Sequence, residues 1–260
     1  MSRLVATFER LRRTKAPGLV CYVTAGDPDI ERSTAVVRAI AEAGADVIEI
    51  GVPFSDPIAD GPVIQRASER ALAAGTSLTS VLAMVADLRT TCETPIVLFT
   101  YVNPVVRMGT AAFVDAAAKA GVDGVLLLDL PIEEAGEMRA ALDSRGLDTI
   151  FLISPTTTVD RLRTAASLGR GFLYAISRLG VTGARDAVAG TARPVVEQIR
   201  AATDLPVALG FGISRPEHVR ETCAYADAAV VGSALVQVIA DAAPGDEARA
   251  AGALVRWLKS

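Results

Sequence analysis

Short runs of aliphatic residues alternate with longer amphipathic stretches along the whole chain. The short runs predict eight strands, at residues 19–23, 47–50, 96–100, 125–128, 149–153, 172–176, 207–209 and 228–231. Between them, apolar residues spaced three and four apart predict helices, for example at 30–43, 77–90, 110–120, 132–144 and 191–202. Regular alternation of strands and helices is typical of a parallel sheet.

Eight strand–helix units in 260 residues match the size of a (β/α)₈ TIM barrel. An open doubly wound sheet usually has fewer strands and a glycine-rich dinucleotide turn after the first of them. That turn is missing, because Gly210-Phe-Gly212 lacks the third glycine. No linker or shift in composition divides the chain. We therefore expect one α/β barrel domain over residues 1–260, with extra helices at the N-terminus and in loops.

The composition narrows the class of protein further. Hydrophobic residues make up 51% and charged residues 22% of the chain, which excludes a disordered protein. The net charge of −4 argues against a nucleic-acid partner. The longest weakly polar run, 228–240, is too short to span a membrane. Charged residues precede any apolar stretch at the N-terminus, so we expect no secretory signal and a cytoplasmic protein.

Two residue types that often carry catalysis are scarce. The chain has one histidine, His218, and only three lysines, Lys15, Lys119 and Lys259. Histidine-rich metal sites, histidine-based triads and most Schiff-base chemistry are therefore disfavoured. The three cysteines lie far apart in apolar segments and are expected to be buried free thiols. We expect no metal site, and we expect His218 to be a surface helix residue.

Glu49 is the first candidate for chemistry. In the second strand the period of two places Val47, Glu49 and Gly51 on one face and two isoleucines on the other. With the isoleucines under the helices, Glu49 points into the barrel. Burial there raises the pKa of a carboxyl group toward the range useful for proton transfer. The alternative is a glutamate at a hydrated strand end.

Asp60 is the second candidate. It lies in the long acidic loop that follows the strand of Glu49, and such loops form the active-site end of a barrel. By itself, Asp60-Gly61-Pro62 also fits a turn followed by a helix start. Two carboxylates on one rim could divide the acid and base duties of one reaction.

Three glycine-bearing segments follow the sixth, seventh and eighth strands. They are Gly180-Val-Thr-Gly183, Gly210-Phe-Gly-Ile-Ser214 and Gly232-Ser-Ala234. Glycines let backbone N–H groups approach an anion, and a helix beginning near Ser233 adds its positive dipole end. These segments predict a phosphate site, although each of them alone fits an ordinary turn.

With these motifs in this order and spacing, the chain resembles the tryptophan synthase α-subunit family. The resemblance covers most of the chain and rests on Tyr22-Val-Thr-Ala-Gly-Asp-Pro28, Glu49-Ile-Gly-Val-Pro-Phe-Ser-Asp-Pro57, Asp60-Gly-Pro-Val-Ile-Gln65, Tyr101-Val-Asn-Pro104, Asp129-Leu-Pro131, Gly180-Val-Thr-Gly183, Gly210-Phe-Gly-Ile213 and Val231-Gly-Ser233. It implies a lyase of tryptophan biosynthesis that cleaves indole-3-glycerol phosphate into indole and glyceraldehyde 3-phosphate by a retro-aldol reaction.

The resemblance also assigns roles to residues. Glu49 and Asp60 fall on the family's acid–base pair, and a flexible lid corresponds to residues 178–188. The implied substrate and phosphate contacts are Tyr174, Thr182, Gly183, Phe211, Gly212, Gly232 and Ser233. The family docks on a β subunit that carries pyridoxal phosphate, in an α₂β₂ heterotetramer with allosteric coupling. The implied docking residues are Pro53, Asp56, Pro57, Asn103 and Pro104.

Indole can act as the electron sink of the cleavage if a base holds its N–H and an acid reaches C3, so two carboxylates suffice. No cofactor is then expected in this chain. The alternatives are another phosphate-binding barrel enzyme, such as a pentose-phosphate epimerase or a thiamine-phosphate-forming enzyme, a stand-alone indole-releasing lyase, and a catalytically weak barrel that serves as a regulatory partner.

Overall fold

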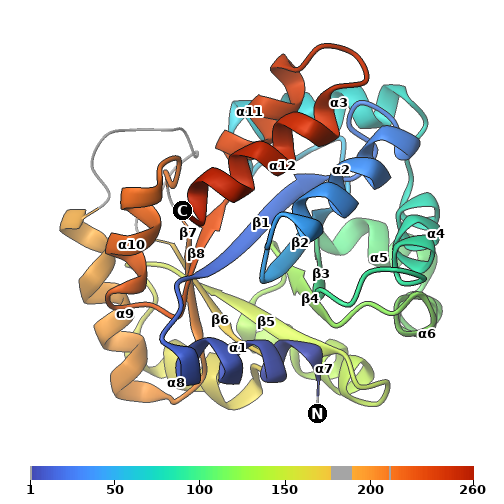
Figure 1. Cartoon of the computed structure of the whole chain (residues 1–260). Coiled ribbons are helices and arrows are strands. Elements are labelled where there is room, and N and C mark those ends of the chain that lie inside the picture. The colour runs from blue at the N-terminus through green and yellow to red at the C-terminus, as the bar shows by residue number, and fades with distance from the viewer. Residues whose placement is uncertain (1, 177–188, 211) are drawn as a thin grey trace.

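The computed structural model describes residues 2–176, 189–210 and 212–260, and within them the predicted barrel is confirmed. Parallel strands close into a ring in chain order, from β1 beside β2 around to β8 beside β1 (Figure 1). The strands are β1 (Gly18–Thr24), β2 (Val47–Gly51), β3 (Ile96–Thr100), β4 (Gly124–Leu127), β5 (Asp148–Ile153), β6 (Leu173–Ile176), β7 (Val207–Gly210) and β8 (Ala228–Val231).

Helices surround the barrel, and several of them begin at a side-chain cap. Asp29, Ser77 and Thr158 each accept a backbone N–H of the first turn that follows. The helices are α1 (Arg3–Thr14), α2 (Ile30–Glu42), α3 (Pro62–Ala73), α4 (Leu78–Leu88), α5 (Val102–Met108), α6 (Thr110–Ala120), η1 (Ile132–Glu134), α7 (Gly136–Asp143), α8 (Val159–Leu168), α9 (Ala189–Ala202), α10 (Pro216–Cys223), α11 (Ser233–Asp241) and α12 (Glu247–Leu258).

One expected helix differs from its prediction. The stretch 132–144 divides into the 3₁₀ turn η1 and the helix α7. Gly136 lies at the junction, where its low helix propensity favours a break in the hydrogen-bond ladder. The other four predicted helices are confirmed, with ends that differ by at most two residues.

Alternation along the strands separates an inner core from an outer one. Val20, Val47 and Val97 belong to a cluster inside the barrel, while Ile48 and Ile50 pack outward in the layer under the helices. Register supports this separation, since Val20 pairs with Val47. The side chain of Glu49, two residues after Val47, therefore points into the barrel, as the alternation predicts.

The N-terminal end of the barrel is closed by α1, which lies across it (Figure 1). Leu4, Phe8 and Leu11 of α1 are buried in the inner cluster, and the Phe8 ring lies 5.3 Å from that of Phe172. This helix therefore plugs one end with apolar side chains. Chemistry that needs an opening must use the opposite end, where the strands finish.

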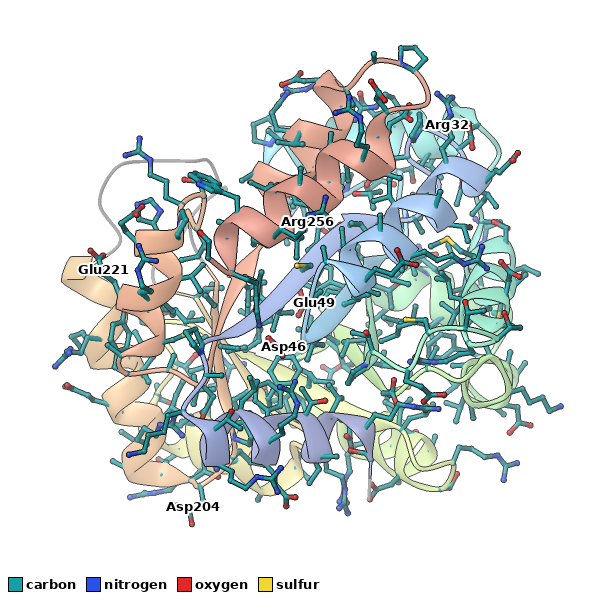
Figure 2. All side chains as sticks on the ribbon, viewed as in Figure 1. Arg32, Asp46, Glu49, Asp204, Glu221 and Arg256 are labelled. Atoms are coloured by element: carbon teal, nitrogen blue, oxygen red, sulfur yellow. The ribbon has the colours of Figure 1, made fainter. Side chains whose placement is uncertain are left out.

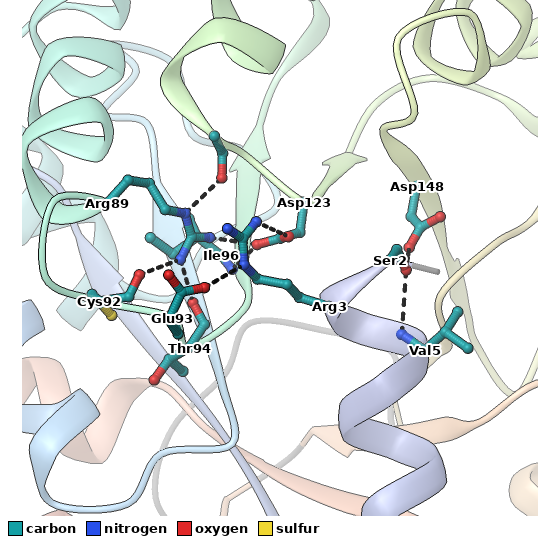
Figure 3. Close-up of polar contacts among 11 residues, drawn as sticks. Ser2, Arg3, Val5, Arg89, Cys92, Glu93, Thr94, Ile96, Asp123 and Asp148 are labelled. Atoms are coloured by element: carbon teal, nitrogen blue, oxygen red, sulfur yellow. Dashed lines mark hydrogen bonds and ion pairs between the residues drawn. The ribbon is translucent and has the colours of Figure 1, made fainter.

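Aspartates that precede strands fix this lower end. Asp46, Asp123 and Asp227 each accept the N–H of a residue on the preceding strand, at 2.8 to 3.0 Å. Basic residues of α1 pair with all three, through Arg10–Asp46, Arg3–Asp123 and Arg12–Asp227. Figure 3 shows Arg3 and Arg89 converging on Asp123, with Ser2 beside Asp148. These three aspartates, each one residue before a strand, thus tie α1 to the strands.

Among the described residues, no single helix is long and apolar enough to cross a membrane. Helices α3 and α4 reach the required length and composition only as a pair, and that pair is bent by 94°. In the same part of the chain, no group of three or more histidine, cysteine, aspartate or glutamate side chains could hold a metal ion.

Candidate active site

Glu49 lies inside the barrel on β2, with 0% of the residue exposed (Figure 2). Neither carboxylate oxygen has a hydrogen-bond partner among the described residues. Burial raises the pKa of Glu49 from 4.5 to about 8, because the ionised form would lose its hydration without compensation. The group therefore holds its proton at neutral pH. A buried carboxyl group without a partner destabilises the fold, which points to a chemical role.

Asp60 lies near the end of the loop between β2 and α3, one residue before the N-cap of that helix. It is 7% exposed, and one carboxylate oxygen accepts the Tyr101 hydroxyl at 3.0 Å. That same hydroxyl accepts the N–H of Ala59 at 3.0 Å, so Tyr101 holds the loop in place. Burial raises the pKa of Asp60 to about 6, and the hydrogen bond from Tyr101 limits this rise. Asp60 is therefore largely ionised at pH 7.

A row of aromatic side chains lies beside the two carboxyl groups. Tyr22 of β1 pairs in register with Glu49, and its ring packs edge-on to that of Phe99 at 5.2 Å. Tyr174 of β6 continues the row, 6.4 Å from Phe99. Burial raises the pKa of both tyrosines, and the charges of Asp60 and Glu49 add to the rise. Both carboxyl groups are therefore close enough to Tyr22 and Tyr174 to affect their pKa values.

Two glycines give these tyrosines their room. A Cβ atom on Gly51 would lie 2.1 Å from the Tyr22 hydroxyl, and one on Gly210 would lie 2.6 Å from that of Tyr174. Any larger residue at either position would displace the ring. The strand ends are thus shaped to hold aromatic side chains over the barrel interior.

The expected phosphate contacts that the structure describes follow β7 and β8 at the same end of the barrel, and Gly232 lies beside Tyr22. Gly232 is the N-cap of α11, and Ser233 is its first residue, as the sequence predicts. Gly212 follows β7 with a φ of +63°, a left-handed conformation that favours glycine. N–H groups at a helix N-terminus are suited to an anion. Thr182, Gly183, Phe211 and the expected lid at 178–188 lie outside the described residues.

Comparisons with known proteins agree with this geometry. A family profile described as tryptophan synthase alpha chain matches residues 8–257. The chain belongs to the tryptophan synthase alpha chain family. A tryptophan synthase alpha chain of Solibacter usitatus is 51% identical over 92% of this chain and 90% of its own length. One of Neisseria meningitidis is 48% identical over 100% of this chain and 98% of its own length.

Solved structures of tryptophan synthase alpha chains have the same fold. Tryptophan synthase subunit alpha of Legionella pneumophila superposes with a TM-score of 0.91 at 38% identity, covering 100% of this chain and 97% of its own. A chain of Mycobacterium tuberculosis tryptophan synthase gives 0.92 at 38% identity, covering 99% and 97%. Family membership gives this chain the alpha-chain activity, a lyase reaction of tryptophan biosynthesis that releases indole from indole-3-glycerol phosphate.

The structure adds residues that sequence reasoning did not assign to the site. Tyr101, which holds Asp60, and Tyr22, which lies beside Glu49 in the strand register, occur in the sequence only as parts of longer motifs. A signal for Tyr22 exists in the sequence, because it lies two residues after inward-facing Val20. No local pattern signals that the Tyr101 hydroxyl reaches back to Asp60, since the two residues are 41 positions apart.

The residues expected at a partner surface differ in exposure. Asp56 and Asn103 are exposed, while Pro57 and Pro104 are half-buried. Pro53 is buried in this chain, unlike the other four docking residues that the resemblance implies. The preceding residue, Val52, is 5% exposed and belongs to the main core, so Pro53 still lies in the interior.

Proposed function

We propose that Glu49 and Asp60 are the acid–base pair that cleaves indole-3-glycerol phosphate in this tryptophan synthase alpha chain. The observation that carries the proposal is the separation of their pKa values, about 8 and about 6, at one end of the barrel. At pH 7 one carboxyl group holds a proton and the other is ionised. Two carboxyl groups in opposite states can serve as acid and base at once.

Glu49 is assigned to the carbon–carbon bond. Its proton goes to indole C3, which leaves positive charge on the ring nitrogen. The resulting Glu49 carboxylate then takes the proton of the adjacent side-chain hydroxyl. The C–O double bond of glyceraldehyde 3-phosphate forms as the bond to C3 breaks, and the electron pair returns to the indole ring. Glu49 ends with the proton number with which it began, so no other reactant is required.

Asp60 is assigned to the ring nitrogen. Its ionised carboxylate accepts the indole N–H and stabilises the positive charge that develops there. Tyr101 directs that carboxylate by donating to one of its oxygens, which leaves the other oxygen for the substrate. The phosphate group is assigned to Gly212, Gly232 and Ser233, and Tyr174 is assigned to the wall of the substrate pocket. This chemistry uses no cofactor in the chain.

The test is steady-state indole release by purified Glu49→Gln and Asp60→Asn proteins. Each amide keeps the shape of its acid but removes the proton transfer, so each rate should fall by about 10²-fold or more. Glu137→Gln, an exposed carboxyl-to-amide change on α7, serves as the control and should act like the parent. The assignment is wrong if either site variant retains activity within about tenfold of the parent.

A partner surface is proposed on the loop after β2 and on α5, the helix that follows β3. Ile58 of the loop and Val106 of α5 are 84% and 60% exposed, and Asp56 and Asn103 on the same two segments are exposed as well. The two segments adjoin, because Ala59 N–H donates to the hydroxyl of Tyr101, the N-cap residue of α5. Exposed apolar residues on neighbouring segments favour a protein interface. The proposed partner is a tryptophan synthase β subunit with pyridoxal phosphate, in an α₂β₂ assembly that receives the indole.

Titration with a purified β subunit tests this surface. Ile58→Asp should abolish complex formation in sedimentation and remove the rate change that the partner causes. Val159→Asp, which changes a 48% exposed valine on α8, is the matched control and should bind like the parent. Equal binding by both variants would place the interface elsewhere. An active chain that binds no β subunit would be a stand-alone indole-releasing lyase.

A further inference from the structure

The loop between β7 and α10 carries one of the proposed phosphate contacts, Gly212. We propose that His218 is a positioning residue that holds this loop in its phosphate-binding conformation. The inference rests on the proposed function, since the phosphate role of the loop is itself part of that proposal. It concerns the chain's one histidine, which the acid–base chemistry does not use.

His218 is turned inward, contrary to the sequence expectation of a surface residue. It is 9% exposed, and its Nδ1 accepts the backbone N–H of Ser214 at 3.3 Å. Pro216 and Val219, on either side of it in α10, are buried as well. The expectation failed because Glu217 and Arg220 make the segment look solvent-exposed, whereas the face that includes His218 packs against the loop.

The bond ties the first turn of α10 to the loop that precedes the helix. The N-cap residue is Arg215, which makes no side-chain capping hydrogen bond to the helix. His218 is the third residue of the helix, the position from which glutamate or glutamine reaches back to a preceding N–H in a capping box. Here the imidazole reaches one residue further, to Ser214. Helix and loop are thereby joined at the point where the chain turns.

Two anchors follow Gly212 directly. The Ile213 side chain is 3% exposed in the main core, and the next N–H, that of Ser214, is held by His218. Gly212 itself adopts a left-handed conformation with no side chain to fix it. The direction of its N–H group therefore depends on these neighbours. Without the His218 bond, the loop would have to be ordered when phosphate binds, and binding would weaken.

Substitutions of His218 test this role. His218→Leu removes the acceptor and His218→Gln retains one. Loss of one hydrogen bond predicts a KM for indole-3-glycerol phosphate that rises about three- to tenfold in the leucine variant, with kcat within about twofold of the parent. The glutamine variant should restore the KM. Should the leucine protein not fold, His218→Met gives the same comparison.

Competitive inhibition by inorganic phosphate and by indole distinguishes binding at the phosphate contacts from binding at the acid–base pair. The inhibition constant of inorganic phosphate should rise with KM in the leucine variant, while that of indole should stay at the parent value. Thr222→Val is the matched control, since Thr222 lies one turn further along α10 and is likewise buried. It should leave both constants unchanged.

The outcomes distinguish the two proposals. A parent protein that releases no indole would overturn the proposed function. An active parent whose leucine variant binds phosphate normally would overturn only the role of His218. A leucine variant in which kcat falls while KM stays constant, or a glutamine variant that rescues nothing, would also overturn it.

Discussion

Replacing Glu49 with glutamine should make the protein more stable, and increasingly so as the pH rises. The pKa of the buried carboxyl group is raised from 4.5 to about 8. Between these values the unfolded chain has lost the proton while the folded chain retains it. Raising the pH therefore favours unfolding, and the stability present below pH 4.5 is lost progressively up to pH 8.

The magnitude follows from the size of the window. Each pH unit within it lowers the free energy of unfolding by about 1.4 kcal/mol. From pH 5 to pH 7, two units, the parent should lose about 2.7 kcal/mol through this one group, and the loss should level off above pH 8. Glutamine does not titrate, so the cost of burying its amide is the same at each pH.

Urea unfolding at pH 5, 6, 7 and 8, followed by circular dichroism, measures the effect. The quantity of interest is the free energy of unfolding of the variant minus that of the parent, because other titrating groups cancel in it. It should rise by about 2.7 kcal/mol from pH 5 to pH 7. The exposed Glu137→Gln change should give a constant difference. A Glu49→Gln difference that is flat or falls with pH would refute the buried, protonated state.

Two further predictions concern residues that support the site and the fold. Tyr101→Phe removes the hydrogen bond that lowers the pKa of Asp60, so the acidic limb of the kcat/KM profile should move to higher pH, and an unmoved limb would contradict the contact. Phe8→Ala empties a buried position under the barrel and should lower the free energy of unfolding by about 3–5 kcal/mol, with kcat/KM of the folded protein unchanged. A loss below about 1 kcal/mol in urea unfolding would show that the helix does not plug the barrel.

The barrel could be predicted from the sequence because its strands are buried on both faces. All eight expected strands are present, with ends that differ by at most one residue. Parallel strands of this kind appear as continuous apolar runs, and Glu49, the one charged residue within the eight predicted strand ranges, stands out for that reason. The pattern of apolar runs therefore predicts both the fold and the first catalytic candidate.

The contacts around the site could not be predicted in the same way. The Tyr101 hydroxyl reaches Asp60 across 41 residues, and His218 turns toward Ser214 although its neighbours in sequence are charged. Both bonds depend on where loops fold back against the barrel. Residue type and periodicity describe a strand or a helix, but they carry no information on which side chain a loop brings to it.

Carboxyl groups with buried side chains occur at both ends of this barrel. Those at the lower end have hydrogen-bond partners and a structural role, and Glu49 differs from them. At the lower end, burial alone would raise the pKa of Asp227, but hydrogen bonds from Arg12 and the Val207 N–H outweigh it and lower the pKa. That carboxylate stays charged and ties α1 to the strands. Glu49 is buried more deeply and has no hydrogen-bond partner among the described residues, and its pKa rises instead. An isolated carboxyl group costs stability in the resting protein, and the proposed proton exchange with a substrate gives a reason for that cost.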